Sequence, residues 1–241
     1  MRQSPPPIAY LLPNLFTAAS IFTGFYAIAL ALEASFVSAA WFIFLALIFD
    51  GLDGRVARMT NTASHFGVEF DSLADIVAFG VAPALLLYLY VGENYGRMGI
   101  VVSALFIIFG AVRLARFNVT TSRIEPSVFI GLPIPTAAIM ISIAVILLEQ
   151  YSTFAALKVF ILPLAAILSI LMVSNIRYPS FKKMNFKTFH FMRFLVALIV
   201  VALGIFIYPI EGMAILAAAY LLYGPFRASF YLLRRFIAYK G

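Results

Sequence analysis

Long, uninterrupted apolar stretches restrict the fold of this chain more than any other feature. A helix needs about 20 mostly apolar residues to cross the hydrocarbon core of a bilayer. Eight segments of this kind follow one another: 15–32, 36–57, 67–91, 98–116, 132–149, 155–175, 191–209 and 212–232. Their apolar residues run continuously rather than at every second position, which excludes a β-barrel. The sequence therefore predicts an all-α fold, a polytopic integral membrane bundle of about eight transmembrane helices.

The composition agrees with a chain that has little mass outside the membrane. Hydrophobic residues make up 64% and charged residues 11% of the sequence, whereas a soluble domain has roughly 45–50% and about 25%. A soluble fold of this size would expose far too much apolar surface to water. The absence of cysteine excludes disulfide bonds and thiolate zinc sites. We therefore expect one membrane-embedded domain over residues 1–241 and no nucleic-acid partner.

The basic residues predict how the helices are oriented. If eight spans leave both termini on one side, all but two of the 17 Lys and Arg residues fall on that side. The two exceptions are Arg97 and Lys158. Membrane proteins keep an excess of basic residues on the cytoplasmic side. Both termini are therefore expected in the cytoplasm, and the net charge of +7 reflects orientation and contact with anionic membrane lipids.

Four aspartates carry the clearest functional signal. Asp50, Asp53, Asp71 and Asp75 lie within 26 residues, at the cytoplasmic end of the second predicted span and the start of the third. Acidic groups at membrane depth are costly and usually mark function. Spacings of three and four residues put each pair on one helix face. If the two helices pack antiparallel, four carboxylates converge near the cytoplasmic interface.

Converging carboxylates need a counter-charge, because like charges disfavour ionisation of their neighbours. Arg55 and Arg58 could form buried ion pairs with them, but two guanidinium groups do not neutralise four carboxylates. Divalent cations would, and an all-oxygen donor set favours Mg²⁺ or Mn²⁺, with Ca²⁺ as the alternative, over zinc. Carboxylate-held metal pairs are a common device for phosphoryl transfer.

Small residues flank the aspartates. Gly54, Ala57 and Gly67 leave room for a ligand to approach the backbone, and Arg58 could hold a phosphate group. The alternative is ordinary packing between membrane helices, where small residues are common. The residues alone leave both interpretations open.

Taken together, these positions form one spaced motif, Asp50-x2-Asp53-Gly54-x2-Ala57-Arg58-x8-Gly67-x3-Asp71-x3-Asp75. It matches every fixed position of the signature of the CDP-alcohol phosphotransferase family, and the chain resembles that family. The resemblance implies a helical membrane enzyme that moves a phosphatidyl-type group from a CDP-linked donor to an alcohol and releases CMP. It also implies two bound divalent metal ions, a homodimer, and a cell (inner) membrane location with the active site at the cytoplasmic face.

The resemblance further implies a role for each motif residue. Asp50, Asp53 and Asp71 match metal ligands. Asp75 completes the metal site and matches the general base, so that Asp71 and Asp75 form the expected catalytic pair. The resemblance assigns contacts with the CDP-lipid to six residues: Asn14, Thr17, Gly54, Ala57, Arg58 and Gly67. Asn14 and Thr17 belong to a short segment that resembles the start of the family's first span.

Three further segments, 113–118, 129–137 and 174–182, resemble the branch of the family whose acceptor is serine. Arg113 and Arg116 are three residues apart and could bind the carboxylate of serine, since a guanidinium matches a carboxylate with two hydrogen bonds. Asn118 could hold the ammonium group. The expected substrates are therefore CDP-diacylglycerol and L-serine.

Other functions stay open at this point. The acceptor could be glycerol phosphate, choline or inositol phosphate, and the donor could carry the ether-linked chains of archaeal lipids. A cation or proton transporter is the alternative from another class, but it would spread its acidic groups across the membrane depth. The last two predicted spans, within 191–232, carry no family likeness.

Overall fold

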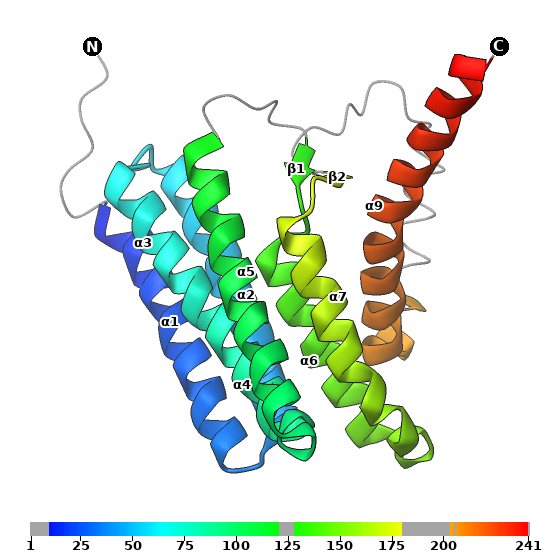
Figure 1. The fold of residues 1–241 in the computed structure, drawn as a ribbon. Coiled ribbons are helices and arrows are strands. Elements are labelled where there is room, and N and C mark those ends of the chain that lie inside the picture. Colours follow the sequence, from blue (N-terminus) through cyan, green and yellow to red (C-terminus); the bar gives the residue numbers. More distant parts are fainter. Residues whose placement is uncertain (1–9, 121–127, 180–202, 205, 241) are drawn as a thin grey trace.

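The chain folds into a bundle of helices in the computed structural model, which describes residues 10–120, 128–179, 203–204 and 206–240 (Figure 1). The elements are α1 (Leu11–Leu32), α2 (Phe36–Met59), α3 (His65–Asp75), η2 (Ile76–Val81), α4 (Ala82–Tyr90), η3 (Gly92–Tyr95), α5 (Arg97–Thr120), β1 (Val128–Ile130), α6 (Ile134–Gln150), η4 (Ser152–Phe160), α7 (Ile161–Val173), β2 (Arg177–Pro179) and α9 (Pro209–Lys240).

Most of the described helices are long enough to cross a lipid bilayer. Six helical segments within the described residues are long and apolar enough to cross a bilayer: 11–32, 36–59, 65–90, 97–120, 156–173 and 209–227. Helix α6 is also apolar but has 17 residues, fewer than the predicted span at 132–149. Most of the predicted span 191–209 lies outside the described residues. The all-helical membrane bundle is thus confirmed, while the number of eight spans stays a prediction.

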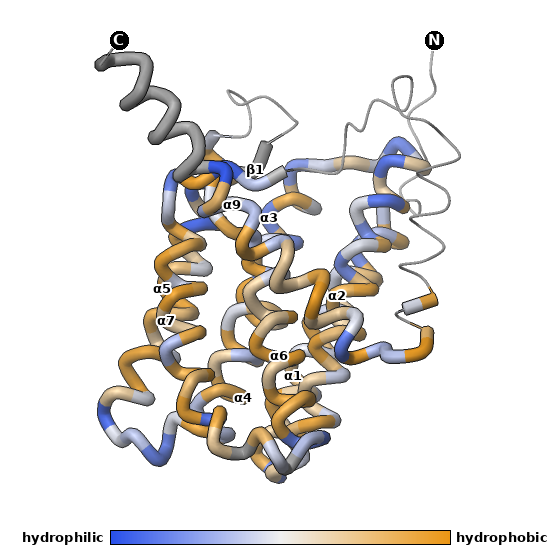
Figure 2. The backbone as a smooth tube through the Cα atoms, turned by 90° about the vertical axis from the view of Figure 1, so that its right-hand side faces the viewer, coloured by the Kyte–Doolittle hydropathy of each residue, from blue (hydrophilic) through white to orange (hydrophobic). Residues whose placement is uncertain are grey.

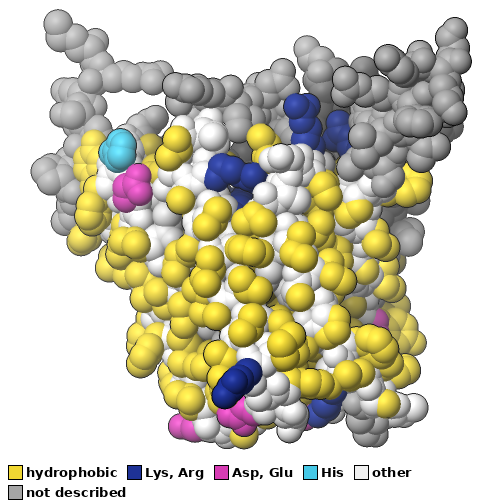
Figure 3. Space-filling model, viewed as in Figure 1, with side chains coloured by type: hydrophobic (Ala, Val, Ile, Leu, Met, Phe, Trp, Pro, Cys, Tyr) yellow, Lys and Arg dark blue, Asp and Glu magenta, His cyan; other side chains and the backbone are white. Residues whose placement is uncertain are grey.

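The surface has the polarity of a membrane protein. Hydrophilic segments lie at the two ends of the bundle, and hydrophobic segments fill the length between them (Figure 2). On the face seen in Figure 3, hydrophobic side chains form a broad band between charged groups at the two ends. Large side chains such as Phe22, Phe25 and Ile108 point outward and are more than half exposed, as expected where lipid replaces water.

Small residues bring α1 and α2 into close contact. The buried side of α1 carries Ser20, Gly24 and Ala27, and Ser20 Oγ donates a hydrogen bond of 3.3 Å to the carbonyl oxygen of Ala46 in α2. Small side chains let membrane helices approach closely, because packing rather than the hydrophobic effect drives their association. This register places Thr17 of α1 opposite Asp53 of α2.

The third predicted span contains a change of helix type. Helices α3 and α4 are joined by the π-helical turn η2, which begins directly after Asp75. Here the backbone runs close to α1, since a Cβ atom on Gly24 would lie 2.7 Å from the Cα atom of Ala78. A π-turn inserts an extra residue per turn, which rotates the following helix. Helix α3 can therefore face α2 with its aspartates while α4 faces the apolar core.

A two-stranded antiparallel ladder pairs Phe129 of β1 with Tyr178 of β2. The sequence predicted helices alone, because three-residue strands carry no detectable periodicity. The turn that follows β1 requires glycine. Gly131 has a φ of +78°, and a Cβ atom there would overlap the carbonyl oxygen of Met172. The Gly131 N–H donates to Ile176 O at 2.8 Å, which joins the start of α6 to the segment after α7.

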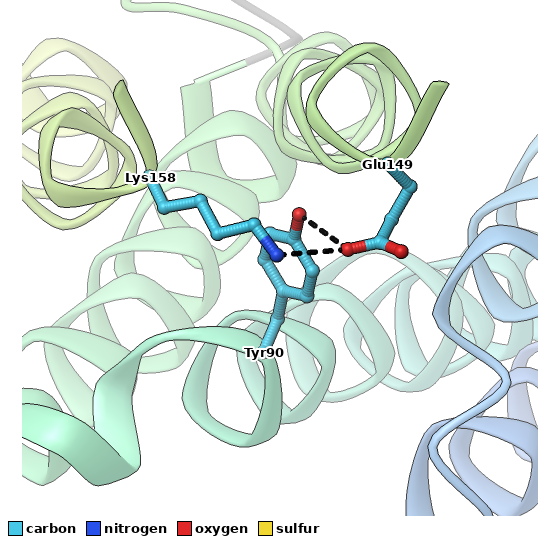
Figure 4. Close-up of polar contacts among 3 residues, drawn as sticks. All are labelled: Tyr90, Glu149 and Lys158. Carbon is cyan, nitrogen blue, oxygen red and sulfur yellow. Dashed lines mark hydrogen bonds and ion pairs between the residues drawn. The ribbon is translucent and has the colours of Figure 1, made fainter. Parts of the chain in front are cut away.

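At the end of the bundle opposite the aspartates, a polar cluster joins α4, α6 and η4 (Figure 4). The Tyr90 hydroxyl at the end of α4 and the Lys158 ammonium of η4 both donate to Glu149 Oε1 of α6, each at 2.9 Å. The ammonium also lies 4.5 Å from the centre of the Tyr90 ring. These contacts connect α4, α6 and η4 at the end of the bundle opposite the aspartates.

Candidate active site

Helices α2 and α3 both pack against α1, and this arrangement brings the aspartates of the two helices together. Carboxylate oxygens of Asp50, Asp53 and Asp71 all lie within 4.8 Å of one another. Asp53 is buried and accepts a hydrogen bond of 2.7 Å from Thr17 Oγ1. Asp75 is also buried, one turn further along α3. The convergence predicted from the two spacings is therefore present in the structure.

This donor set fits a divalent cation. All the side chains offer hard carboxylate oxygens, which suit Mg²⁺, Mn²⁺ or Ca²⁺. Within the described part of the chain, Asp71 Oδ1 and Asp75 Oδ1 are buried without a hydrogen-bond partner. A buried polar oxygen without a partner is costly, and coordination of a cation would remove that cost.

A small cavity of about 200 Å³ lies on one side of the aspartates. Its lining includes Asp53 and Asp71 together with all six residues that the family resemblance assigns to the CDP-lipid: Asn14, Thr17, Gly54, Ala57, Arg58 and Gly67. Ser64 also lines this cavity, and its hydroxyl caps the start of α3 by accepting the Gly67 N–H at 3.0 Å. Residues from three separate segments therefore form one pocket.

A larger cavity of about 730 Å³ lies on the other side, between α2, α3, α5, α6 and α9. Asp50, Asp71 and Asp75 line it, and apolar side chains form most of the remaining wall. Asp71 lines both cavities. The aspartates thus form a shared wall between two pockets, which is an arrangement suited to a reaction between two substrates.

Two of the three residues predicted to bind serine line this larger cavity. Arg113 is buried, and its guanidinium carbon lies 5.4 Å from the centre of the Phe117 ring. The Asn118 amide nitrogen donates to Ser72 Oγ at 3.0 Å and to Glu69 Oε2 at 3.4 Å. These bonds direct the amide nitrogen toward α3, so the carbonyl oxygen is the atom that Asn118 can offer to an ammonium group.

Arg116 lines neither cavity. Its guanidinium donates to the carbonyl oxygens of Ile130, Val173 and Ser174 and to Asn175 Oδ1, at 3.0 to 3.3 Å. Side chains three residues apart on an α-helix differ by about 60° in direction, and here that angle separates Arg116 from Arg113. The sequence grouped the two arginines, whereas the structure places only Arg113 at the cavity.

These contacts predict a structural effect of Arg116→Ala. Because hydrogen bonds to charged groups contribute about 1.5–3 kcal/mol, we expect the free energy of unfolding to fall by about that amount. Thermal unfolding in detergent measures the change. Arg55→Ala is the control, since Arg55 is exposed on α2. Equal unfolding midpoints for the two variants would show that the four contacts do not stabilise the fold.

Sequence reasoning missed the contribution of the C-terminal helix. Met213, Leu216, Ala217 and Tyr220 of α9 line the larger cavity. Helix α9 was expected to be a generic span, because an apolar segment without a motif does not indicate which of its faces meets a substrate. Only its packing against α6 and β2 reveals that role.

Comparison with known proteins gives consistent matches. The family model described as CDP-alcohol phosphatidyltransferase matches residues 10–171. The CDP-diacylglycerol–serine O-phosphatidyltransferase of Helicobacter pylori is 50% identical over 226 residues, which cover 93% of this chain and 94% of the relative. The enzyme of the same name from Bacillus subtilis is 38% identical over 71% of this chain and 92% of the relative. The archaetidylserine synthase of Methanothermobacter thermautotrophicus is 38% identical over 73% of each chain.

Proposed function

The chain belongs to the CDP-alcohol phosphatidyltransferase family, and on that premise we propose that it transfers the phosphatidyl group of CDP-diacylglycerol to the hydroxyl of L-serine. The products are phosphatidylserine and CMP. The observation that carries the proposal is the 50% identity, over 93% of the chain, to a relative named for this reaction. The two cavities that share Asp71 support it, because the reaction joins a nucleotide-linked lipid to a small polar acceptor.

The smaller cavity would take the CDP part of the donor. Gly54, Ala57 and Gly67 leave space for it, and Arg58 would bind a phosphate group. Asp50, Asp53 and Asp71, with Asp75 completing the set, would hold two divalent cations, Mg²⁺ or Mn²⁺ with Ca²⁺ as the alternative, which polarise the reacting phosphoryl group and neutralise its charge.

The larger cavity would take the acceptor. Arg113 would bind the carboxylate of serine and Asn118 its ammonium group, while Arg116 holds the backbone segments behind them. Asp75 would accept the proton of the serine hydroxyl. The serine oxygen then forms a bond to the lipid-bearing phosphorus, and the bond from that phosphorus to the bridging oxygen breaks. CMP leaves with the electron pair.

The proposed topology is a single domain of eight spans, with α6 and the segment 191–209 added to the six long helices. Both termini and the aspartates would face the cytoplasm from the inner membrane. Arg97 and Lys158 support this orientation, because they lie at the end of the bundle opposite Arg58 and Arg113, and basic residues accumulate on the cytoplasmic side. The protein would work as a homodimer, as the family resemblance implies.

One assay tests the proposed reaction. Purified protein is incubated with CDP-diacylglycerol, Mg²⁺ or Mn²⁺, and one alcohol at a time: L-serine, glycerol 3-phosphate, choline or inositol phosphate. We expect release of CMP and formation of phosphatidylserine with serine alone. Release of CMP with another alcohol, and none with serine, would contradict the proposal.

A second candidate changes only the donor. The similarity to an archaetidylserine synthase favours a CDP-lipid with ether-linked isoprenoid chains as an alternative substrate. The same assay, run with equal concentrations of the ester and ether donors in competition, separates the two. We expect the ester lipid to be consumed first, since the relative that is 50% identical is named for CDP-diacylglycerol.

A further inference from the structure

Helix α9 closes the acceptor side of the site, although it lies beyond the residues that the family model matches. It stands alongside α6 and β2 (Figure 1). Most of the residues that it adds to the larger cavity are apolar, and Tyr220 is the polar exception among them. Its phenol hydroxyl is a hydrogen-bond donor that an anionic group in the cavity could use.

A contact with β2 sets the position of Tyr220. The Tyr220 ring stacks on the fully buried ring of Tyr178, with centroids 5.4 Å apart and an angle of 30° between the ring planes. One turn further along α9, Gly224 lies against the same ring, and a Cβ atom on Gly224 would overlap it. The absence of a side chain at Gly224 therefore allows α9 to approach β2.

Arg113 and Asp75 share the larger cavity with Tyr220. The Arg113 guanidinium and the Asp75 carboxylate are both buried, and their opposite charges attract each other. All three residues line the larger cavity. Its wall therefore presents a carboxylate, a guanidinium and a phenol.

These three groups complement the functional groups of the proposed acceptor. Serine carries its hydroxyl and its carboxylate on neighbouring carbon atoms. With the hydroxyl at Asp75, the carboxylate would bind Arg113, and its second oxygen could accept a further hydrogen bond. We propose that Tyr220 is a specificity-determining residue, whose hydroxyl donates to the acceptor carboxylate that Arg113 binds; the inference rests on the proposed function.

Tyr220→Phe tests the role of the hydroxyl, because phenylalanine keeps the ring that stacks on Tyr178. We expect the KM for serine to rise about tenfold to a hundredfold, as loss of a hydrogen bond to a charged group implies. The KM for CDP-diacylglycerol and the kcat should stay close to those of the parent. Tyr223→Phe is the matched control, since Tyr223 is 46% exposed on the same helix.

Serinol is an analogue of serine in which a hydroxymethyl group replaces the carboxylate. Its use as an acceptor shows whether Y220F affects recognition of the carboxylate or the structure of the site in general. The kcat/KM for serinol should be the same in Y220F and the parent, so that the preference for serine shrinks. A merely structural role of Tyr220 would lower the values for both acceptors together.

Gly224→Ala tests whether the position of α9 against Tyr178 matters, without changing any atom of Tyr220. The added methyl group should displace α9 from Tyr178, and we expect it to raise the KM for serine more than the KM for CDP-diacylglycerol. Gly204→Ala is the control, because among the described residues no atom lies within 4 Å of a Cβ atom at that position. Its kinetics should equal those of the parent.

The outcomes distinguish this inference from the proposed function. An unchanged KM for serine in Y220F, in a parent that uses serine, overturns the inference alone. A parallel rise in the donor KM, or an equal fall in kcat/KM with serinol, also overturns it. CMP release by the parent with another alcohol and none with serine overturns the proposed function, and the inference with it.

Discussion

Asp71→Asn is expected to reduce CMP release by about 10²–10⁴-fold, the factor that corresponds to several kcal/mol of lost metal assistance. Asp71 lines both cavities, and its carboxylate lies with those of Asp50 and Asp53. A neutral amide is a poorer ligand for a hard cation than a carboxylate. The rate of CMP release with CDP-diacylglycerol and serine measures the loss.

The fold should survive this substitution. The amide has nearly the shape of the carboxylate and removes a like charge from beside two others. The unfolding midpoint without added metal should therefore not fall, while the rise that Mg²⁺ or Mn²⁺ produces in the parent should be lost. Glu93→Gln, an exposed acid at the opposite end of the bundle, is the control. Full activity of D71N with added metal would contradict the metal-site proposal.

Removal of metal from the unchanged protein should have the same effect as D71N. A chelator is expected to stop CMP release, and an excess of Mg²⁺ or Mn²⁺ should restore it, because the carboxylates remain in place. Undiminished activity after exhaustive chelation would also contradict a role for the metal.

The second large effect separates the two cavities. Arg58→Ala should raise the KM for CDP-diacylglycerol about tenfold to a hundredfold with every acceptor alcohol. Arg58 lines only the smaller of the two cavities, and its guanidinium lies over Gly54. Removal of the guanidinium would leave the donor phosphate without its cationic partner.

Arg113→Ala should show the opposite pattern. Arg113 lines the larger cavity, so the KM for serine should rise by a similar factor while the KM for CDP-diacylglycerol stays nearly unchanged. Initial rates over a grid of both substrate concentrations measure the two constants together. If R58A and R113A raise the donor KM alike, the assignment of one substrate to each cavity is wrong.

The features that sequence alone predicted are those encoded over short distances along the chain. Continuous apolar runs predicted membrane helices, because the bilayer sets their length. Spacings of three and four residues predicted that Asp50 and Asp53 share one helix face, and that Asp71 and Asp75 share another. The motif over residues 50–75 predicted the family, and the matching family model confirms that prediction.

Some features of the site depend on both the local sequence and the tertiary packing of the helices. Asn14 and Thr17 were assigned to the CDP-lipid by resemblance, and the packing of α1 against α2 brings them to the small cavity beside Asp53. The π-turn after Asp75 could not be predicted from the apolar pattern, because an extra residue in a uniformly apolar helix does not alter its composition. Similarly, the ladder of β1 and β2 is too short to be recognised from alternation.

Which side chains face which cavity was decided only by the tertiary structure. Arg113 and Arg116 have equivalent positions at the end of one predicted span, yet Arg113 lines the larger cavity and Arg116 binds backbone carbonyls from two distant segments. Tyr220 lies more than a hundred residues from Arg113 in sequence but shares its cavity. Local spacing determines the face of a helix on which a residue lies, whereas the partner of that face depends on how helices from remote parts of the chain pack together.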